Sequence, residues 1–345
     1  MDLRLDVAMT TSETNHVDLK AVPLMPKWSR YARQPVDVSR RRSIEIRNLS
    51  KDNDQPIVAD APPTLIVDYF LHNSEFRTAE IPLDGVTEVF GQAFNFSAVK
   101  TRRKNDGVEV IHNRHGLPKR RLPILNHVQS RFRFAPESPI RLFPLGTTDL
   151  THPVETIDDF VYSLEVTGPK GVKFNLRDGL RGNLLSAHRM LSTQEMVFER
   201  LVVENQVVTE SPPLDLTAEE KQALLLASLL RSHRAGMTEA YYLYHVCGTN
   251  NCTSSPFQIL DQVVQYNLPE RIGSMLYRLP LNPRFYLRVR GLDSNPNVRR
   301  IVRDEFLEYI ESESTRIRKR IYVTQHNAAK RARRLESDSD RLTSG

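Results

Sequence analysis

The stretch ILNHVQSRFRF, residues 124–134, alternates two kinds of side chain and predicts a β-strand in the middle of the fold. From Val128 to Phe134 every second side chain is apolar or small, whereas the intervening positions from His127 to Arg133 are polar or basic. Because successive side chains of a strand point to opposite faces of a sheet, one face of this strand belongs to a core. We therefore predict a half-buried strand whose polar face carries His127 and Gln129.

Other strands are predicted on both sides of this one. FVYSLEV (160–166) alternates in the same way and puts Glu165 among small or polar neighbours. Enrichment in β-branched and aromatic residues, or alternation, favours further strands, with strand pieces expected at 43–49, 64–70, 77–96 and 195–209. The basic, turn-rich stretch 100–121 predicts an exposed loop or hairpin.

Helices are expected mainly in the second half of the chain. Thr217 and Glu220 have the spacing of a capping box before an apolar stripe, which predicts a helix. A second helix should begin at Asn251 or Cys252, because Asn251 is a natural N-cap. A final helix is expected over about 298–334. The chain is therefore expected to be an α+β protein with a central antiparallel sheet, packed helices and a C-terminal helical extension.

Composition limits the classes of protein to which this chain can belong. Of its 345 residues 48 are Lys or Arg and 42 are Asp or Glu, which gives a formal net charge of +6. The only cysteines, Cys247 and Cys252, lie in one short segment, so a disulfide scaffold is excluded and a reducing compartment is expected. The first twenty residues lack the apolar core of a signal peptide, and no apolar run reaches membrane-spanning length. We expect a cytoplasmic protein, or a membrane-associated one if an upstream segment precedes this sequence.

Cys252 is the residue that suggests chemistry. A cysteine at the N-terminus of a helix faces unpaired N–H groups and the positive end of the helix dipole, which favour the thiolate and could hold an oxyanion. The alternative is a buried small apolar residue, the commonest fate of a free cysteine. His127 alone is more often structural, and Glu165 alone is more often a solvated carboxylate. Together they offer the nucleophile, base and orienting group of a triad.

Four segments resemble motifs of one family, the soluble domain of the Lnb-type lipoprotein N-acyltransferases. NHVQSRFRF (126–134) is similar to its histidine strand, and YSLE (162–165) to its glutamate strand. LTAEE (216–220) is similar to its "L-[ST]-x-E" segment, and NNCT (250–253) to its cysteine segment. The resemblance extends from about Trp28 to Leu292. A valine and a threonine replace the arginine that follows the glutamate motif in the family.

The resemblance implies a circularly permuted papain-like fold and acyl transfer or hydrolysis through a thioester, with lipid-linked acyl groups among the substrates. Cys252 would be the nucleophile, His127 the base and Glu165 the group that orients it. The helix start at Asn251 and Thr253 would hold the oxyanion. Cleft residues would be Asn250, Asn126, Gln129 and Tyr244. No cofactor and no metal is expected.

The predicted domain boundaries follow from the same resemblance. We expect a disordered arm over 1–27, a catalytic domain over 28–292, a helical extension over 293–334 and a disordered tail over 335–345.

Three other interpretations remain open. A metal site is disfavoured because the candidate ligands (His245, Cys247 and Cys252, or His112 and His115) lack a second ligand pair at zinc-site spacing. A basic surface that binds nucleic acid or a membrane has support in basic clusters at 40–42, 102–104, 119–121, 316–320 and 330–334. These clusters lack interleaved aromatics and any nucleic-acid motif, so an acyl-bearing substrate and an anionic membrane surface are favoured over nucleic acid. A catalytically inactive scaffold is the third.

Overall fold

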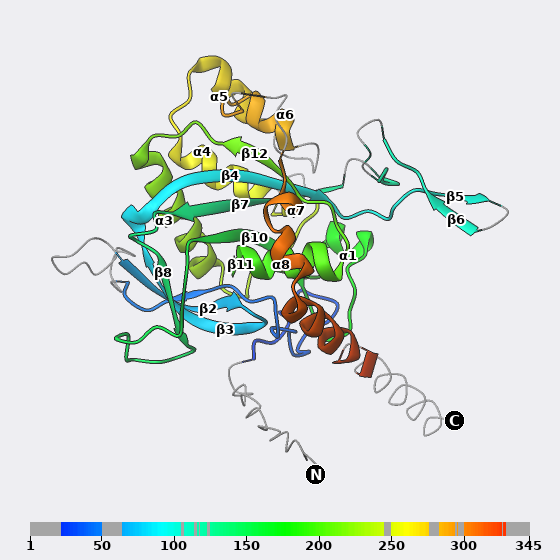
Figure 1. Cartoon of the computed structure of the whole chain (residues 1–345), viewed down its shortest axis with the longest axis horizontal. Helices are drawn as coiled ribbons and strands as arrows, with labels where there is room; N and C mark the ends of the chain where they lie inside the picture. Colours follow the sequence, from blue (N-terminus) through cyan, green and yellow to red (C-terminus); the bar gives the residue numbers. More distant parts are fainter. Residues whose placement is uncertain are drawn as a thin grey trace, which may run out of the picture.

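A computed structural model of the chain describes residues 22–49, 64–104, 107–113, 116, 118–122, 125–244, 250–275, 283–293, 295, 300–325 and 327–328. The described part is an α+β structure built on one large sheet, with helices packed on its faces (Figure 1). This confirms the predicted fold class at its coarse level.

Eleven strands of the described part form this sheet, in the order β13-β12-β4-β7-β10-β11-β2-β3-β8-β9, with β1 paired to β2 outside that path. They are β1 (Glu45–Ile46), β2 (Thr64–His72), β3 (Glu75–Pro82), β4 (Val86–Asn95), β7 (Asn126–Phe134), β8 (Ile140–Pro144), β9 (Glu155–Ile157), β10 (Asp159–Thr167), β11 (Leu185–Ser192), β12 (Thr209–Pro213) and β13 (Arg300–Ile301). Two further strands, β5 (Thr101–Lys104) and β6 (Gly107–Val110), pair only with each other.

The sheet is mixed, and not purely antiparallel as predicted. Its strands pair antiparallel except for β11 and β2, which run parallel at Leu191 and Leu71. The central pairs are β4–β7, from Asn95 opposite Asn126 onward, and β7–β10, where Ser163 lies opposite Gln129. Because β7 begins where β10 ends, His127 and Glu165 come to the same end of the sheet. The alternation in residues 124–134 and 160–166 was therefore a sound guide to both strands.

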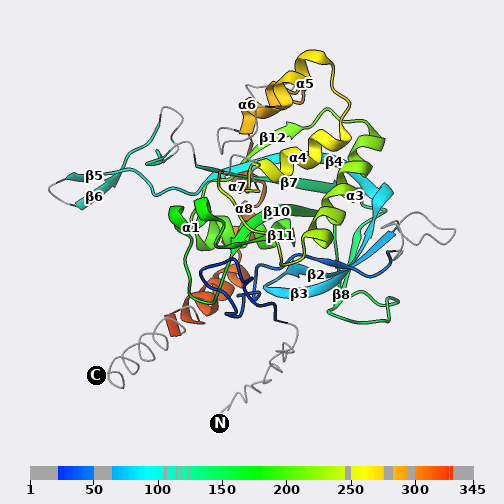
Figure 2. The ribbon, with the colours of Figure 1, turned by 180° about the vertical axis from the view of Figure 1, so that it is seen from behind.

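Helices cover both faces of this sheet (Figure 2). They are α1 (Leu176–Arg181), α2 (Thr193–Val197), α3 (Ala218–Ala235), α4 (Ser254–Val263), α5 (Leu268–Ser274), α6 (Pro283–Arg288), α7 (Val302–Glu305) and α8 (Leu307–Glu311), with a 3₁₀ turn η2 (Leu83–Gly85) and a π-helical turn η3 (Phe198–Val203). The capping box predicted at Thr217 and Glu220 begins α3. Helices α3 and α4 pack together and with strands β4, β7, β10 and β11.

The two faces of the sheet are buried in different ways. On one face Phe132, Tyr162 and Phe257 belong to the main apolar core that α3 and α4 complete. On the other face Val161 packs against Met196 of α2 in a smaller apolar cluster. That second face also buries charged and polar side chains of β7, so β7 is not the half-buried strand that was predicted. Helices α2 and α7 and the turn η3 cover this second face of the sheet.

Two predicted elements are wrong. Residues 195–209 do not form a strand pair, because Ser192 caps the amide of Glu195 and the chain continues as α2 and η3 up to Val203. Burial of this apolar run against the sheet overrides its β propensity. The last helix is interrupted as well: Arg300 and Ile301 pair with β12, two short helices follow, and a longer helix occupies 313–325.

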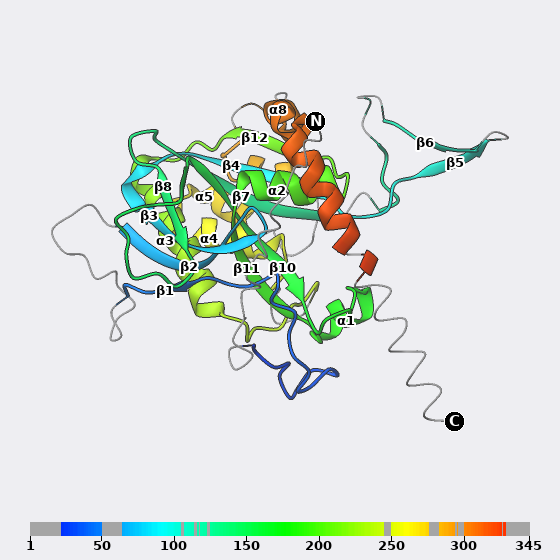
Figure 3. The ribbon, with the colours of Figure 1, turned by 60° about the horizontal axis from the view of Figure 1, so that its bottom comes forward.

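The ends of the predicted domains can be compared with this arrangement. Within the arm predicted over 1–27, residues 22–27 are described, and Met25 is buried against Leu185 and Met237. The predicted extension contributes Val302 to the second apolar cluster, so it is part of the same body (Figure 3). The predicted tail over 335–345 lies outside the described residues, as do Cys247, His115 and His245.

Candidate active site

Cys252 lies two residues before helix α4, which begins at Ser254, so the helix starts two or three residues later than the sequence predicted. The side-chain oxygen of Asn251 accepts hydrogen bonds from the amides of Thr253 (2.9 Å) and Ser254 (2.8 Å), so Asn251 caps the first turn. Its amide nitrogen donates to the carbonyl of Leu243 (2.8 Å), which ties the start of the helix to the preceding chain. The start of the helix is therefore held in place, because the Asn251 side chain accepts hydrogen bonds from the amides of Thr253 and Ser254, which at the start of a helix have no partner within the helix.

The thiol of Cys252 is buried between two neighbours. Its Sγ lies 3.8 Å from the main-chain oxygen of Asn126 and 3.9 Å from the hydroxyl of Tyr241. Thr253 also binds Asn126, because its hydroxyl donates to the same oxygen at 3.1 Å. Cys252 is 3% exposed, and burial raises the pKa of its thiol to about 11. The helix start is thus packed against the first residue of β7, and the thiol is protonated at neutral pH.

His127, the next residue along β7, is directed toward β10. Its Nε2 lies 2.8 Å from the Ser163 hydroxyl, and its ring stacks on Phe94 with the ring centroids 4.7 Å apart. Burial lowers the pKa of this imidazole to about 3; the charge of Glu165 acts in the opposite direction and favours the imidazolium. Among the described residues no hydrogen-bond partner is found for Nδ1, and no hydrogen bond joins the ring to the Cys252 thiol. The imidazole is neutral and fixed at one nitrogen.

Glu165 binds arginines and does not bind His127. Its carboxylate accepts hydrogen bonds from Arg189 (2.7 Å), Arg41 (3.1 Å) and Arg200. Burial by itself would raise the pKa of this carboxyl, but the three guanidinium groups hold it well below its ordinary value. The negative charge of Glu165 nevertheless acts on both Cys252 and His127, because it raises the pKa of each group.

The predicted cleft residues fall into two groups. Asn126 contacts Cys252 and Thr253 through its main chain, so it belongs to the site. Gln129 donates to Gln92 (2.7 Å) in a buried polar network, and Asn250 donates to Ser186, Glu239 and the carbonyl of Ala240. Both have structural partners. Tyr244 is 47% exposed, and no described contact ties it to the thiol.

Two residues of the site were not predicted, Ser163 and Tyr241. Ser163 is two residues before Glu165 on β10, so strand alternation alone assigns it to the face that carries Glu165. Tyr241 belongs to an aromatic run that precedes the cysteine segment. Its position is fixed by α1 and by the chain that follows α1, since the amide of Leu243 donates to the carbonyl of Gly179 (2.9 Å) and that of Tyr241 to the carbonyl of Leu184 (2.8 Å). Gly182 adopts φ +66°, and a Cβ there would meet the Tyr242 ring at 2.3 Å.

A cleft of about 1010 Å³ opens at the same end of the sheet. Its wall includes Arg41, which binds Glu165, and Val166, which follows Glu165 on β10. Phe174 also lines it and packs edge-on against Tyr241, with ring centroids 6.0 Å apart. Two aromatic rings therefore separate the cleft from the thiol. Its volume is at the upper end of the range for small-ligand sites.

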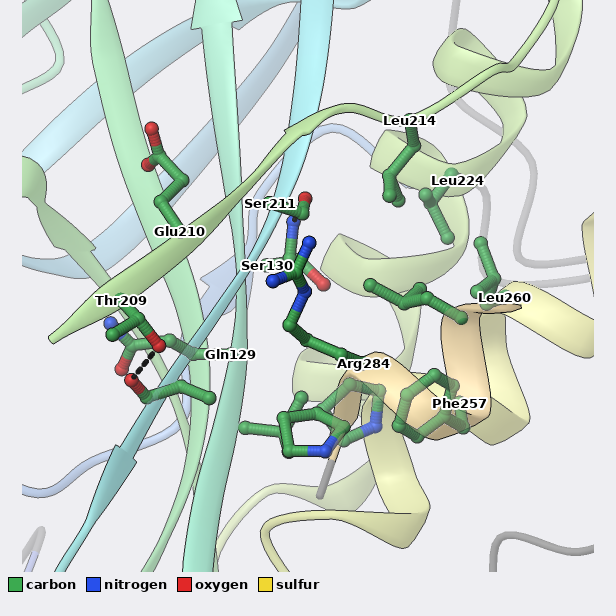
Figure 4. A pocket seen from close by; sticks show the side chains of 16 residues that line it. Gln129, Ser130, Thr209, Glu210, Ser211, Leu214, Leu224, Phe257, Leu260 and Arg284 are labelled. Atoms are coloured by element: carbon green, nitrogen blue, oxygen red, sulfur yellow. Dashed lines mark hydrogen bonds between the residues drawn. The ribbon is translucent and has the colours of Figure 1, made fainter. Parts of the chain in front are cut away.

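A second pocket lies on the other side of α4 and is too small for a substrate (Figure 4). It measures about 30 Å³, which accommodates about one or two water molecules. Phe257 and Leu260 of α4 line it together with Ser211 of β12, whereas Cys252 does not. The pocket is a packing feature between α4 and the sheet, and the larger cleft is the candidate substrate site.

The comparisons with known proteins identify no relative. No protein-family model, no curated protein and no solved structure matches this chain. In the described part of the chain, no group of three or more histidine, cysteine, aspartate or glutamate residues is arranged to hold a metal ion. Nor does any described helix combine the length and apolar character needed to cross a membrane.

Proposed function

We propose that this chain is a cysteine-dependent acyltransferase or hydrolase with a permuted papain-like arrangement, in which Cys252 is the nucleophile and His127 the base. The observation that carries the proposal is the packing of the Cys252 helix start against the first residue of the histidine strand, with 3.8 Å between Sγ and the Asn126 oxygen. The order of histidine strand, glutamate strand and cysteine helix is the one that the resemblance implies. Nucleophilic catalysis requires the thiol and the imidazole to lie within hydrogen-bond distance of each other. In the structure the His127 ring stacks on Phe94 on one face of the sheet, whereas α4 packs on the other face, so the two groups would have to meet at the end of the sheet.

The reaction would start from a neutral thiol and a neutral imidazole. As Sγ bonds to the carbonyl carbon of an ester or amide, Nδ1 of His127 would accept the thiol proton, and the carbonyl π pair would move to oxygen. This step requires the ring to come within hydrogen-bond distance of Sγ. The tetrahedral intermediate would collapse with loss of the alcohol or amine, which takes the proton from His127. Water or an amine would then resolve the thioester in the same way.

Ser163 and Glu165 support this step differently. Ser163 binds Nε2 and is therefore the positioning residue for the imidazole, the part that sequence resemblance assigned to Glu165. Glu165 would stabilise the imidazolium, because its negative charge raises the pKa of His127. The arginines around Glu165 keep that carboxylate ionised.

The oxyanion would be held by groups other than those predicted. The amide of Thr253 already donates to the Asn251 side chain, so it is not available. The main-chain amide of Cys252 remains as a donor, and the hydroxyl of Tyr241, which donates weakly to Sγ at 3.9 Å, would turn to the oxyanion as the thiol reacts. The substrate would approach from the cleft, past Phe174 and Tyr241, and the apolar side chains there suit an acyl chain.

The test is the capture of an acyl-enzyme. The full chain is incubated with p-nitrophenyl butyrate, and the intact mass and the modified peptide are determined. We expect one butyryl group on Cys252, its loss in Cys252→Ala, and acylation slowed by several orders of magnitude in His127→Gln. Cys247→Ser is the matched control and should be acylated like the parent. Acylation of Cys247 or of lysines alone, or a parent that reacts no faster than its unfolded chain, would contradict the proposal.

A further inference from the structure

A basic arm, residues 97–122, interrupts the pairing of β4 with β7. The two strands remain paired up to Asn95 and Asn126, and the arm leaves the sheet between these positions. Its outer part is the ribbon of β5 and β6, which forms a separate two-stranded sheet. Figures 1 and 3 show this ribbon well outside the body of the protein. A segment that extends from a complete sheet contributes little to the hydrophobic core, so core packing does not explain the residues of this arm.

The arm carries the net charge of the whole chain. It holds eight Lys and Arg against two Asp and Glu, a net charge of +6, which equals the formal net charge of all 345 residues. The remainder of the protein therefore has no net charge. Five of these cations are exposed in the structure, and within the described residues no ion pair is found for any of them: Lys100, Arg102, Arg103, Lys119 and Arg121. Such a concentration of unpaired charge favours a polyanionic partner.

The distribution of the cations distinguishes between kinds of polyanion. They follow both chains of the arm, and residues two apart on an extended strand are about 7 Å apart. In the sequence, Asn105 and Asp106 stand between the two strands, so an acid interrupts the run of cations there. A membrane anchor would instead combine apolar or aromatic residues with cations on the inserted part. Charge along the length of a ribbon suits a linear polyanion.

The shape and composition of the arm favour a duplex over a single strand. The major groove of B-DNA is wide enough for a two-stranded β-ribbon. Residues 97–122 contain no Phe, Tyr or Trp, the side chains on which the bases of single strands stack. We propose that the basic arm binds double-stranded DNA through its phosphates, without reading the base sequence. This binding is independent of the proposed thiol chemistry.

The expected strength follows from counterion release. If four or five cations each neutralise a phosphate, log K falls with log salt with a slope of about −4. Sequence-independent contacts of this kind give dissociation constants of about 1–100 μM at physiological salt. Removal of two arm cations should make the slope shallower by about two and weaken binding at low salt about tenfold or more.

The experiment measures fluorescence anisotropy of a labelled duplex of about 20 base pairs, titrated with the full chain between about 50 and 200 mM NaCl, the range over which phosphate contacts are screened. Arg102→Ser/Arg103→Ser and Lys119→Ser/Arg121→Ser are the arm variants. Lys319→Ser/Arg320→Ser removes the same charge from an exposed part of the C-terminal helix and is the matched control. We expect both arm variants to lose affinity and salt dependence, with the control within about twofold of the parent.

Three results would overturn the proposal. The first is a parent that does not bind the duplex at the lowest salt concentration. The second is a control that loses as much affinity as the arm variants, which would assign binding to overall charge. The third is binding to phosphatidylserine vesicles that depends on the arm while DNA binding does not, which would identify a membrane partner. Because all substituted side chains are exposed, thermal unfolding should be unchanged, and Cys252→Ala should bind DNA like the parent.

Discussion

The Nε2 of His127 and the hydroxyl of Ser163 lie 2.8 Å apart across the β7–β10 pair, both buried. This contact fixes one nitrogen of the ring, whereas no hydrogen-bond partner is found for Nδ1 among the described residues. The pKa of His127 is low because the ring is buried beside Phe94, and the nearby arginine charges lower it further while the charge of Glu165 raises it.

Ser163→Ala should cost about 1–3 kcal/mol of unfolding free energy, because it leaves a buried ring nitrogen without a partner. It should also slow acylation of Cys252 by p-nitrophenyl butyrate. Ser163→Thr keeps a hydroxyl and should retain much of both the unfolding free energy and the acylation rate. Urea unfolding and intact-mass kinetics measure the two effects. Ser130→Ala, on the opposite face of β7, is the control. Equal effects of Ser163→Ala and Ser130→Ala would argue against a positioning role.

Stability should fall as the pH drops from about 6.5 toward 4. Burial lowers the pKa of His127 to about 3 and that of His188 to about 4, from an ordinary value of 6.5. Below pH 6.5 the unfolded chain therefore binds protons that the folded chain does not, and each histidine costs about 1.4 kcal/mol per pH unit. Urea unfolding at several pH values should show this slope, and His188→Gln should reduce it by about half. Exposed His152→Gln should leave the slope unchanged, and a slope insensitive to His188→Gln would refute this account.

Glu165→Gln should destabilise the fold by about 3 kcal/mol, because it removes a buried carboxylate from between buried arginines. The folded-state pKa of Glu165 is depressed, so its contribution is complete above about pH 4.5 and is lost as the pH falls further. The comparison is Glu204→Gln, which removes a carboxylate that is 38% exposed and also binds Arg200. That variant should cost less than about 1 kcal/mol. Chemical denaturation near pH 7 distinguishes the two, and equal losses would contradict the expectation.

Arg131→Met should be more damaging than Arg133→Met, although both arginines lie on β7. Arg131 is almost fully buried and binds Asp159, Glu210 and Glu305, so its removal leaves three carboxylates close together. We expect a loss of about 3–5 kcal/mol, against about 1 kcal/mol or less for the partly exposed Arg133. Thermal or urea unfolding measures both. A parent-like Arg131→Met would mean that this cluster does not hold α7 on the sheet.

Cys252 should be alkylated by iodoacetamide at pH 7 more slowly than the same cysteine in the unfolded chain. The reason is burial, which raises the pKa of the thiol to about 11, so the rate should climb until about that pH. Intact mass spectrometry of Cys247→Ser follows this cysteine alone. Rapid alkylation at neutral pH that depends on His127 would instead indicate a preformed thiolate–imidazolium pair.

The sequence anticipated the strands and the helix start around the thiol, because both depend on local patterns. Alternation identified the strands of His127 and Glu165, and the capping potential of Asn251 located the turn before α4. Residues 195–209 were mistaken for strands, because the cap at Ser192 and burial of Met196 decide their structure.

The site itself depends on register and packing, which local patterns do not contain. Nothing in YSLE (162–165) indicates that Ser163, and not Glu165, is the hydrogen-bond partner of His127. The partners of Glu165 are 24 to 124 residues away in the chain, at Arg41, Arg189 and Arg200. The burial of the second face was missed for the same reason, since α2 and α7 come from distant segments.

The pairing of β4 with β7 up to the base of the basic arm has a further consequence. Trypsin should cut first in this arm, because its lysines and arginines are exposed and lie away from the body of the protein. The two fragments would remain joined by the ladder that runs from Asn95–Asn126 to Val86–Phe134. The protein is thus suited to being produced as two separate polypeptides, divided within the arm, that reassemble when mixed.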